Sequence, residues 1–141
     1  MRISDRQALR QQLRQHEGWE RFPYRDTVGK LSIGCGRNLD DRGLSDEEIA
    51  YLQNNDINEC FRQLDASFPW FFSLDVVRQR VLVDLCFMGI GTLRGFVKML
   101  AAMERHDWAT ASEELLASRY ATQTKGRAIT LAEMLRPGEA A

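Results

Sequence analysis

The sequence has few histidines and few cysteines. Among its 141 residues, the histidines are His16 and His106, and the cysteines are Cys35, Cys60 and Cys86. A zinc site requires several such ligands at short spacing, and no such group is present. The cysteines are odd in number, widely spaced and set in apolar patterns, which predicts three buried free thiols. A catalytic Cys35–His16 pair has no support beyond proximity in the sequence.

The sequence also lacks a long apolar run and an excess of charge of one sign. No segment approaches the ~20 apolar residues that span a bilayer, and the N-terminus lacks the apolar region of a signal peptide. The formal net charge is −1, whereas a dedicated nucleic-acid-binding domain normally carries a basic excess. We therefore expect synthesis in a cytoplasm, no nucleic-acid partner and no stable insertion into a membrane.

The composition is typical of a globular protein. Hydrophobic residues make up 44% and charged residues 28% of the chain, and its length favours a single domain with a sizeable core. No internal repeat, low-complexity stretch or flexible linker divides the sequence. We expect a monomer.

Helical patterns cover most of the chain outside one short segment. Ser4 with Gln7, and Ser45 with Glu48, have the spacing of N-terminal capping boxes. Ser73 and Asp107 are expected to cap two later helices, and glycines at 89 and 91 to end the first of them. The predicted helices are one ending at Glu17 and others over about 46–65, from Ser73 to Phe87, 93–105, 108–118 and 125–135.

β character is confined to residues 20–39. A turn at Asp-Thr-Val-Gly leads into a strand in which Leu31, Ile33 and Cys35 alternate with Lys30, Ser32 and Gly34. This alternation predicts that Ser32 lies on the more polar face, away from the buried side. So small a sheet cannot form a core alone, so we expect it to pack on the helical body and to border a cleft.

Glu17, Asp26 and Ser32 form the candidate site in this region. Glu17 continues the apolar stripe of Leu9 and Leu13, so we expect partial desolvation of its carboxyl, which favours the neutral acid. A neutral acid paired with a second carboxylate is what acid/base cleavage of a glycosidic bond requires. Each residue also has a structural interpretation, as a solvated or ion-paired helix end, a turn former and an ordinary strand residue.

The segment from Glu17 to Gly36 contains Glu-Gly, Phe-Pro-Tyr-Arg-Asp-Thr and Ser-Ile-Gly-x-Gly. It resembles the active-site segment of the T-even-type phage lysozymes, glycoside hydrolase family 24. The similarity extends over most of the chain, through Gly89, Gly95-Phe96, the region 108–120, Gln123-Thr124 and Arg127-Ala128.

The resemblance implies an α+β fold, mostly helical and lysozyme-like, as one domain over 1–141. A sheet-bearing lobe would cover about 15–45, a helical lobe 1–14 and 66–141, and the long helix would join them. It also implies a bacteriolytic muramidase, or endolysin. Such an enzyme hydrolyses the β-1,4 bond between N-acetylmuramic acid and N-acetylglucosamine in peptidoglycan, with inversion and without a metal or organic cofactor. The implied partner is the glycan strand, reached after release from a host cytoplasm.

The resemblance also implies roles for individual residues. Glu17 matches the catalytic acid of the family, and Asp26 matches the carboxylate that activates the attacking water. Ser32 falls where the family commonly has Thr, so the hydroxyl is kept. Phe87 matches an aromatic of the sugar-binding cleft, although it also fits a buried helix position, and Arg127 matches an arginine that faces the catalytic Glu.

The sequence departs from the family pattern in three places, and two other functions stay open. Arg37 stands where the family can have His, Glu114 stands where an Asn can contact sugar, and the stretch 38–45 is shorter than in larger members.

The chain could be a non-catalytic peptidoglycan-binding module with the same fold, because fold does not guarantee activity. It could also be a lytic transglycosylase, which uses one Glu; Asp26 argues against that alternative.

Overall fold

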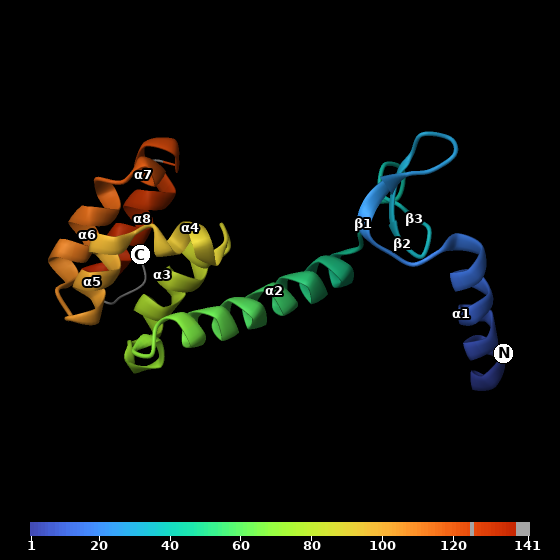
Figure 1. The fold of residues 1–141 in the computed structure, drawn as a ribbon, viewed down its shortest axis with the longest axis horizontal. Coiled ribbons are helices and arrows are strands. Elements are labelled where there is room, and N and C mark those ends of the chain that lie inside the picture. Colours follow the sequence, from blue (N-terminus) through green and yellow to red (C-terminus); the bar gives the residue numbers. More distant parts are fainter. Residues whose placement is uncertain (125, 138–141) are drawn as a thin grey trace. The chain divides into compact units, whose positions relative to one another are not determined.

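The computed structural model describes residues 1–124 and 126–137 (Figure 1). The fold is α+β and mostly helical, as predicted. The chain divides into two compact units, Met1–Tyr51 and Leu52–Ala141. The boundary lies within the long helix α2 (Asp46–Ser67), which therefore begins in the first unit and ends in the second.

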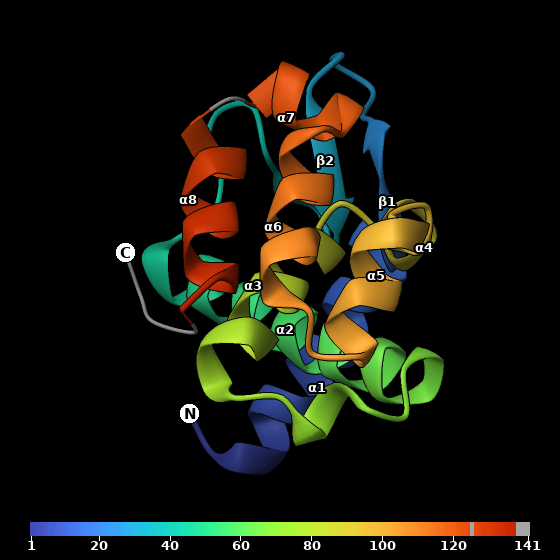
Figure 2. The ribbon, with the colours of Figure 1, turned by 90° about the vertical axis from the view of Figure 1, so that its left-hand side faces the viewer.

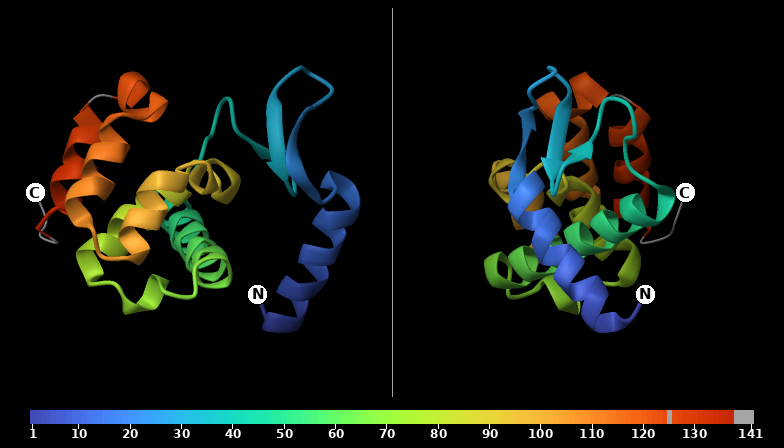
Figure 3. Two further views of the ribbon diagram at one scale, coloured as in Figure 1. Left: turned by 60° about the vertical axis from the view of Figure 1, so that its left-hand side comes forward. Right: turned by 90° about the vertical axis from the view of Figure 1, so that its right-hand side faces the viewer.

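The first unit holds a helix and a small antiparallel sheet. Helix α1 (Ile3–Glu17) leads into strand β1 (Glu20–Arg25), as Figure 3 shows. Strand β2 (Leu31–Gly34) lies between β1 and β3 (Arg37–Asn38) and pairs antiparallel with both. The third strand extends the predicted hairpin. This unit also contains residues 1–14, which the sequence analysis assigns to the helical lobe.

One of the two predicted capping boxes is present. The Glu48 N–H donates to Ser45 Oγ at 3.2 Å, and the Ser45 N–H donates to Glu48 Oε1 at 3.0 Å, which confirms the box that opens α2. The box predicted at Ser4 is wrong, because α1 already begins at Ile3 with Arg2 at the N-cap position, and Arg2 makes no side-chain cap.

An ion pair connects the sheet of the first unit to the start of α2. Arg37 Nη1 lies 2.7 Å from Glu48 Oε1 and 2.6 Å from Oε2, and it also donates to the Gly43 carbonyl at 3.2 Å. The guanidinium therefore fixes strand β3, the following loop and the first turn of α2 together. The capping box orients the same Glu48 carboxylate.

The second unit is a set of helices packed on one another. Helix α6 packs against α5 and α8, and α8 also packs against α3 and α7 (Figure 2). No helix in the described part of the chain has both the length and the apolarity to cross a bilayer. The elements are the 3-10 helix η1 (Phe71–Ser73) and helices α3 (Val76–Cys86), α4 (Ile90–Arg94), α5 (Val97–Glu104), α6 (Trp108–Leu116), α7 (Arg119–Thr124) and α8 (Gly126–Leu135).

Several predicted helix boundaries differ from the structure. The Asp107 cap is confirmed, since its side chain accepts from the Thr110 N–H at 3.2 Å. Asp75, and not Ser73, caps α3. Helix α3 ends at Cys86, and Gly89, with a φ of 109°, occupies the N-cap position of α4, whereas Gly91 lies inside α4.

Two predicted segments are divided further. The helix predicted over 93–105 is replaced by α4 and α5, which are separated at Gly95 and Phe96. The last predicted helix corresponds to α8, and its expected first residue, Lys125, lies outside the described residues. Helix α7 is additional.

Every buried hydrophobic side chain among residues 1–124 and 126–137 belongs to the second unit. The core is formed mainly by leucines, methionines and Phe71 from α2, η1 and the later helices. Cys60 and Cys86 are buried there, as predicted. Cys35 is exposed, so that prediction is wrong, because Cys35 follows the end of β2 and lies in the turn to β3.

A buried arginine connects α3 to the end of α8. Arg78 Nε donates to the Leu135 carbonyl at 2.7 Å, and Nη2 donates to the Arg136 carbonyl at 2.6 Å. These bonds satisfy carbonyls that a helix C-terminus leaves unpaired. The guanidinium also lies 3.7 Å from the ring centroid of Trp108, and Nη1 bonds the Asp75 carboxylate. The charge is therefore compensated inside the helical unit.

The Arg37–Glu48 contact predicts a pH dependence of stability. Hydrogen bonds, first from Arg37 and then from the Ser45 backbone, lower the pKa of Glu48 from 4.5 to about 2. A carboxyl with a lowered folded pKa gives stability that is complete above its unfolded pKa and is lost as the pH falls toward the folded value. The unfolding temperature of the wild type, followed by circular dichroism, should therefore fall more steeply from pH 5 to pH 2 than that of Glu48→Gln.

The control for this prediction is Glu47→Gln, which changes an exposed carboxyl in the same helical turn. Its pH profile should follow the wild type. Parallel profiles for Glu48→Gln and the wild type would contradict the contribution of the ion pair.

Candidate functional site

Glu17 is the last residue of α1 and lies against the turn between β2 and β3. Gly18 ends the helix with a φ of 86°, and its N–H donates to the Arg14 carbonyl at 3.0 Å. A Cβ atom added to Gly36 would lie 2.7 Å from Glu17 Oε2 and 3.1 Å from its Cδ. The absence of a side chain at Gly36 therefore makes room for the Glu17 carboxyl.

Within its own unit Glu17 has little apolar cover, so the expected partial desolvation stays a prediction. Glu17 is exposed, α1 buries none of its residues, and Leu13 is 42% exposed. The apolar stripe exists in the sequence, but the small sheet of the same unit does not cover it. The sequence pattern alone therefore does not establish a low-dielectric environment for this carboxyl.

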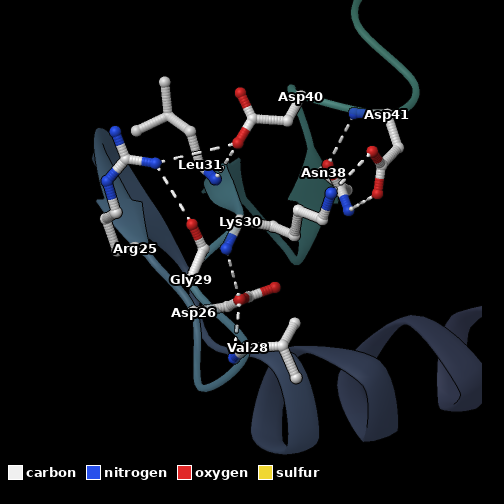
Figure 4. Close-up of polar contacts among 9 residues, drawn as sticks. All are labelled: Arg25, Asp26, Val28, Gly29, Lys30, Leu31, Asn38, Asp40 and Asp41. Carbon is white, nitrogen blue, oxygen red and sulfur yellow. Dashed lines mark hydrogen bonds and ion pairs between the residues drawn. The ribbon is translucent and has the colours of Figure 1, made fainter.

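Asp26 forms the turn between β1 and β2, as Figure 4 shows. Its Oδ1 accepts from the Val28 N–H at 3.0 Å and from the Lys30 N–H at 2.8 Å. Its own N–H donates to the Lys30 carbonyl at 2.9 Å, and its carbonyl accepts from the Gly29 N–H at 3.0 Å. These bonds confirm the turn-forming interpretation of Asp26 and hold its carboxylate in one orientation.

The carboxylates of Asp40 and Asp41, which follow β3, bind the first residue of β2 and the residue before it. Asp40 Oδ2 accepts from the Leu31 N–H at 2.8 Å, and Asp41 Oδ1 accepts from Lys30 Nζ at 3.1 Å (Figure 4). The mutual hydrogen bond raises the pKa of Lys30 and lowers that of Asp41. Asn38 Nδ2 donates to Asp41 Oδ2 at 3.0 Å and Asn38 Oδ1 accepts from the Asp41 N–H at 2.9 Å, so the loop after β3 is tied to the hairpin.

Ser32 is buried, so its predicted exposure on the open face of the hairpin is wrong. It is 3% exposed and lies on the central strand, paired with Tyr24 on β1 and with Asn38 on β3. The third strand pairs with the edge of β2 that a two-stranded hairpin would leave free, so Ser32 lies on a central strand. No side-chain hydrogen bond of Ser32 is formed with the described residues.

Phe87 and Arg127 are brought together in the second unit. Phe87 follows the end of α3, and Arg127 is in the first turn of α8. Both line a cavity of about 420 Å³ with Ile57, Phe61 and Asp84. Phe87 is 47% exposed, so the interpretation of Phe87 as a core residue is wrong for this unit.

A larger groove in the second unit has a lining that the sequence analysis did not predict. It measures about 590 Å³ and lies between α5, α6 and α7. Its lining is mainly apolar, with Phe96 and Met99, and includes the charged side chains of Lys98 and Glu114. The full lining comes from α4, α5, α6 and α7, so sequence spacing gives no signal that groups it.

The sequence-predicted site residues thus fall in both units. Glu17, Asp26 and Ser32 belong to Met1–Tyr51, and Phe87 and Arg127 belong to Leu52–Ala141. Within residues 1–124 and 126–137, no three His, Cys, Asp or Glu side chains are gathered as a metal ion would require. No protein-family model matches the chain, and no curated protein matches it.

The close approach of Glu17 to Gly36 predicts that alanine destabilises the fold more at Gly36 than at Gly34. Gly34 and Gly36 have φ of 69° and 73°, so alanine at either position should cost about 1–2 kcal/mol through backbone strain. A Cβ at Gly34 meets nothing within 4 Å, whereas one at Gly36 meets Glu17. The free energy of unfolding, measured in urea, should therefore fall more in Gly36→Ala than in Gly34→Ala.

A second substitution tests the cause of this difference. Glu17→Ala removes the carboxyl that a Gly36 side chain would meet at 2.7 Å. It should therefore reduce the extra cost of Gly36→Ala without changing that of Gly34→Ala. Equal costs at the two glycines would show that the Glu17 side chain is not held at this turn.

Proposed function

We propose that the protein is a muramidase that hydrolyses the β-1,4 bond between N-acetylmuramic acid and N-acetylglucosamine in peptidoglycan. The observation that carries the proposal is the grouping of two carboxyls and a hydroxyl within one small unit. Glu17 lies against the turn after β2, Ser32 lies on β2, and Asp26 forms the turn before β2. The resemblance of this segment to the phage lysozymes supports the same activity.

Glu17 would act as the general acid. It stands at the end of α1, beside the turn between β2 and β3. Its exposed position gives a glycosidic oxygen access to the proton. Proton donation to the leaving oxygen is the step that glycoside hydrolysis requires first.

Asp26 would orient and activate the attacking water. The two backbone amides bond Oδ1, so the carboxylate is fixed while Oδ2 keeps its lone pairs for a water molecule. Ser32 would bond the same water, because its hydroxyl is free of side-chain hydrogen bonds to the described residues. Attack by a water held on the far side of the sugar inverts the anomeric centre and requires carboxyls about 6.5–9.5 Å apart.

The second unit would bind the glycan strand. The exposed ring of Phe87 offers an apolar face to a sugar, and Arg127 offers N–H donors to its oxygens. Two carboxyls and a water complete the reaction, so the proposal includes no metal or organic cofactor. The proposed enzyme acts as a monomer on cell-wall glycan, after synthesis in a cytoplasm and release to the wall.

Glu17→Gln tests the proposed general acid. The amide is nearly isosteric and cannot donate a proton to the leaving oxygen, so the rate should fall by at least ~10²–10⁴. The measurement is loss of turbidity of outer-membrane-permeabilised Gram-negative cells. Glu20→Gln, which changes an exposed carboxyl on β1, is the matched control and should lyse cells at the wild-type rate. Near-normal lysis by Glu17→Gln would refute the assignment.

Ser32 gives a second prediction that separates activity from stability. Ser32→Ala removes a hydroxyl with no hydrogen bond to the described residues, so the free energy of unfolding should change by less than about 1 kcal/mol while activity falls sharply. Ser32→Thr keeps the hydroxyl and should remain active, but its added methyl must fit a buried site and should cost about 1–3 kcal/mol. Wild-type lysis by Ser32→Ala would mean that another group holds the water.

A further inference from the structure

An ion pair between α3 and α8 fixes one side of the Arg127 guanidinium. Arg127 Nε donates to Asp84 Oδ1 at 2.8 Å, and Nη2 donates to the same oxygen at 2.5 Å. Nη2 also donates to the Asp84 backbone carbonyl at 3.1 Å. Three hydrogen bonds to one residue leave the guanidinium plane little freedom to rotate.

The remaining nitrogen of the guanidinium is left for another partner. No residue in 1–124 or 126–137 accepts from Arg127 Nη1, and the Arg127 side chain is 48% exposed. Arg127 lines the cavity of about 420 Å³ together with Asp84 and the exposed ring of Phe87. Arg127, held on its Nε side, therefore keeps two N–H donors on Nη1 without a described acceptor, in a cavity that Phe87 also lines.

We propose that Asp84 is a positioning residue for Arg127. Its carboxylate and its carbonyl orient the guanidinium so that Nη1 donates to an oxygen of the bound glycan next to Phe87. The assignment rests on the proposed function for the identity of the ligand, whereas the orientation of Arg127 by Asp84 does not. Asp84 itself does not touch the substrate in this arrangement.

Orientation and charge compensation are separable roles for Asp84. If Asp84 orients Arg127, the essential feature is an oxygen acceptor at the Oδ1 position, which Asn also provides. If Asp84 only compensates the charge of Arg127, Asn and Ala are equivalent because both are neutral. The comparison of Asp84→Asn with Asp84→Ala therefore distinguishes the two roles.

The first experiment measures release of reducing ends from purified peptidoglycan. Asp84→Ala should lower kcat/KM about tenfold, mainly through KM, because a misplaced binding group loses much of its contribution. Asp84→Asn should recover most of that loss. In the Arg127→Ala background, Asp84→Ala should have no further effect, since its action passes through Arg127. Additive losses, or equal losses for Asn and Ala, would overturn the proposal.

A matched control separates this effect from the loss of any surface ion pair. Glu113 pairs with Arg136 at 3.7 Å in the same unit, and its side chain is 68% exposed. Glu113→Gln should leave kcat/KM unchanged. A tenfold loss in Glu113→Gln as well would show that the assay reports general destabilisation, and the role of Asp84 would be rejected.

The second experiment does not depend on activity. In nitrogen–proton correlation spectra, the Arg127 Nε–H resonance of the wild type should be sharp and slow to exchange. Asp84→Ala should broaden it or speed its exchange, whereas Asp84→Asn should keep it. An unchanged resonance in Asp84→Ala would overturn the positioning role. If the wild type released no reducing ends while these resonances behaved as expected, the proposed muramidase function would fail and the positioning of Arg127 would stand.

Discussion

Polar contacts hold the candidate carboxyls in place. The unit that carries them, Met1–Tyr51, contains no buried hydrophobic side chain. The Asp26 carboxylate closes the β1–β2 turn through two backbone amides. The Arg37–Glu48 pair joins the sheet to α2, and the Gly36 backbone leaves room for Glu17. Since such contacts are directional, they can place a carboxyl accurately without the area of apolar burial that stabilises the second unit.

A structural role and a catalytic role are compatible in Asp26. A carboxylate has about four lone-pair sites, and the turn uses those of Oδ1 alone in the contacts described. The turn would then provide the rigid support that a catalytic group needs. The same logic applies to Arg127, whose Nε side is fixed by Asp84 while Nη1 has no described acceptor.

Local sequence signals predicted the features that depend on neighbouring residues. The Ser45–Glu48 box and the Asp107 cap involve residues three positions apart, so the sequence contains both partners. The place of Ser32 on a central strand depends on β3, a two-residue strand too short to give a periodic signal. The α+β class followed from the contrast between one β segment and many helical patterns.

Contacts between distant segments left no signal in the sequence. The Asp84–Arg127 pair joins residues 43 positions apart, and either residue alone fits an ordinary solvated helix face. The groove beside Phe96 and Glu114 is likewise assembled from four helices. The apolar stripe that leads to Glu17 is not covered by its own unit, so the predicted desolvation of this carboxyl stays a prediction.

The most direct test of the central claim is the chemistry of the product released from purified peptidoglycan. If Glu17 protonates the leaving oxygen and Asp26 directs water to the opposite face, the β-linked substrate gives a reducing sugar. Proton NMR should then show the α anomer first, followed by mutarotation. Anhydro-muropeptides without reducing ends would contradict hydrolysis, and an initial β anomer would contradict the role given to Asp26.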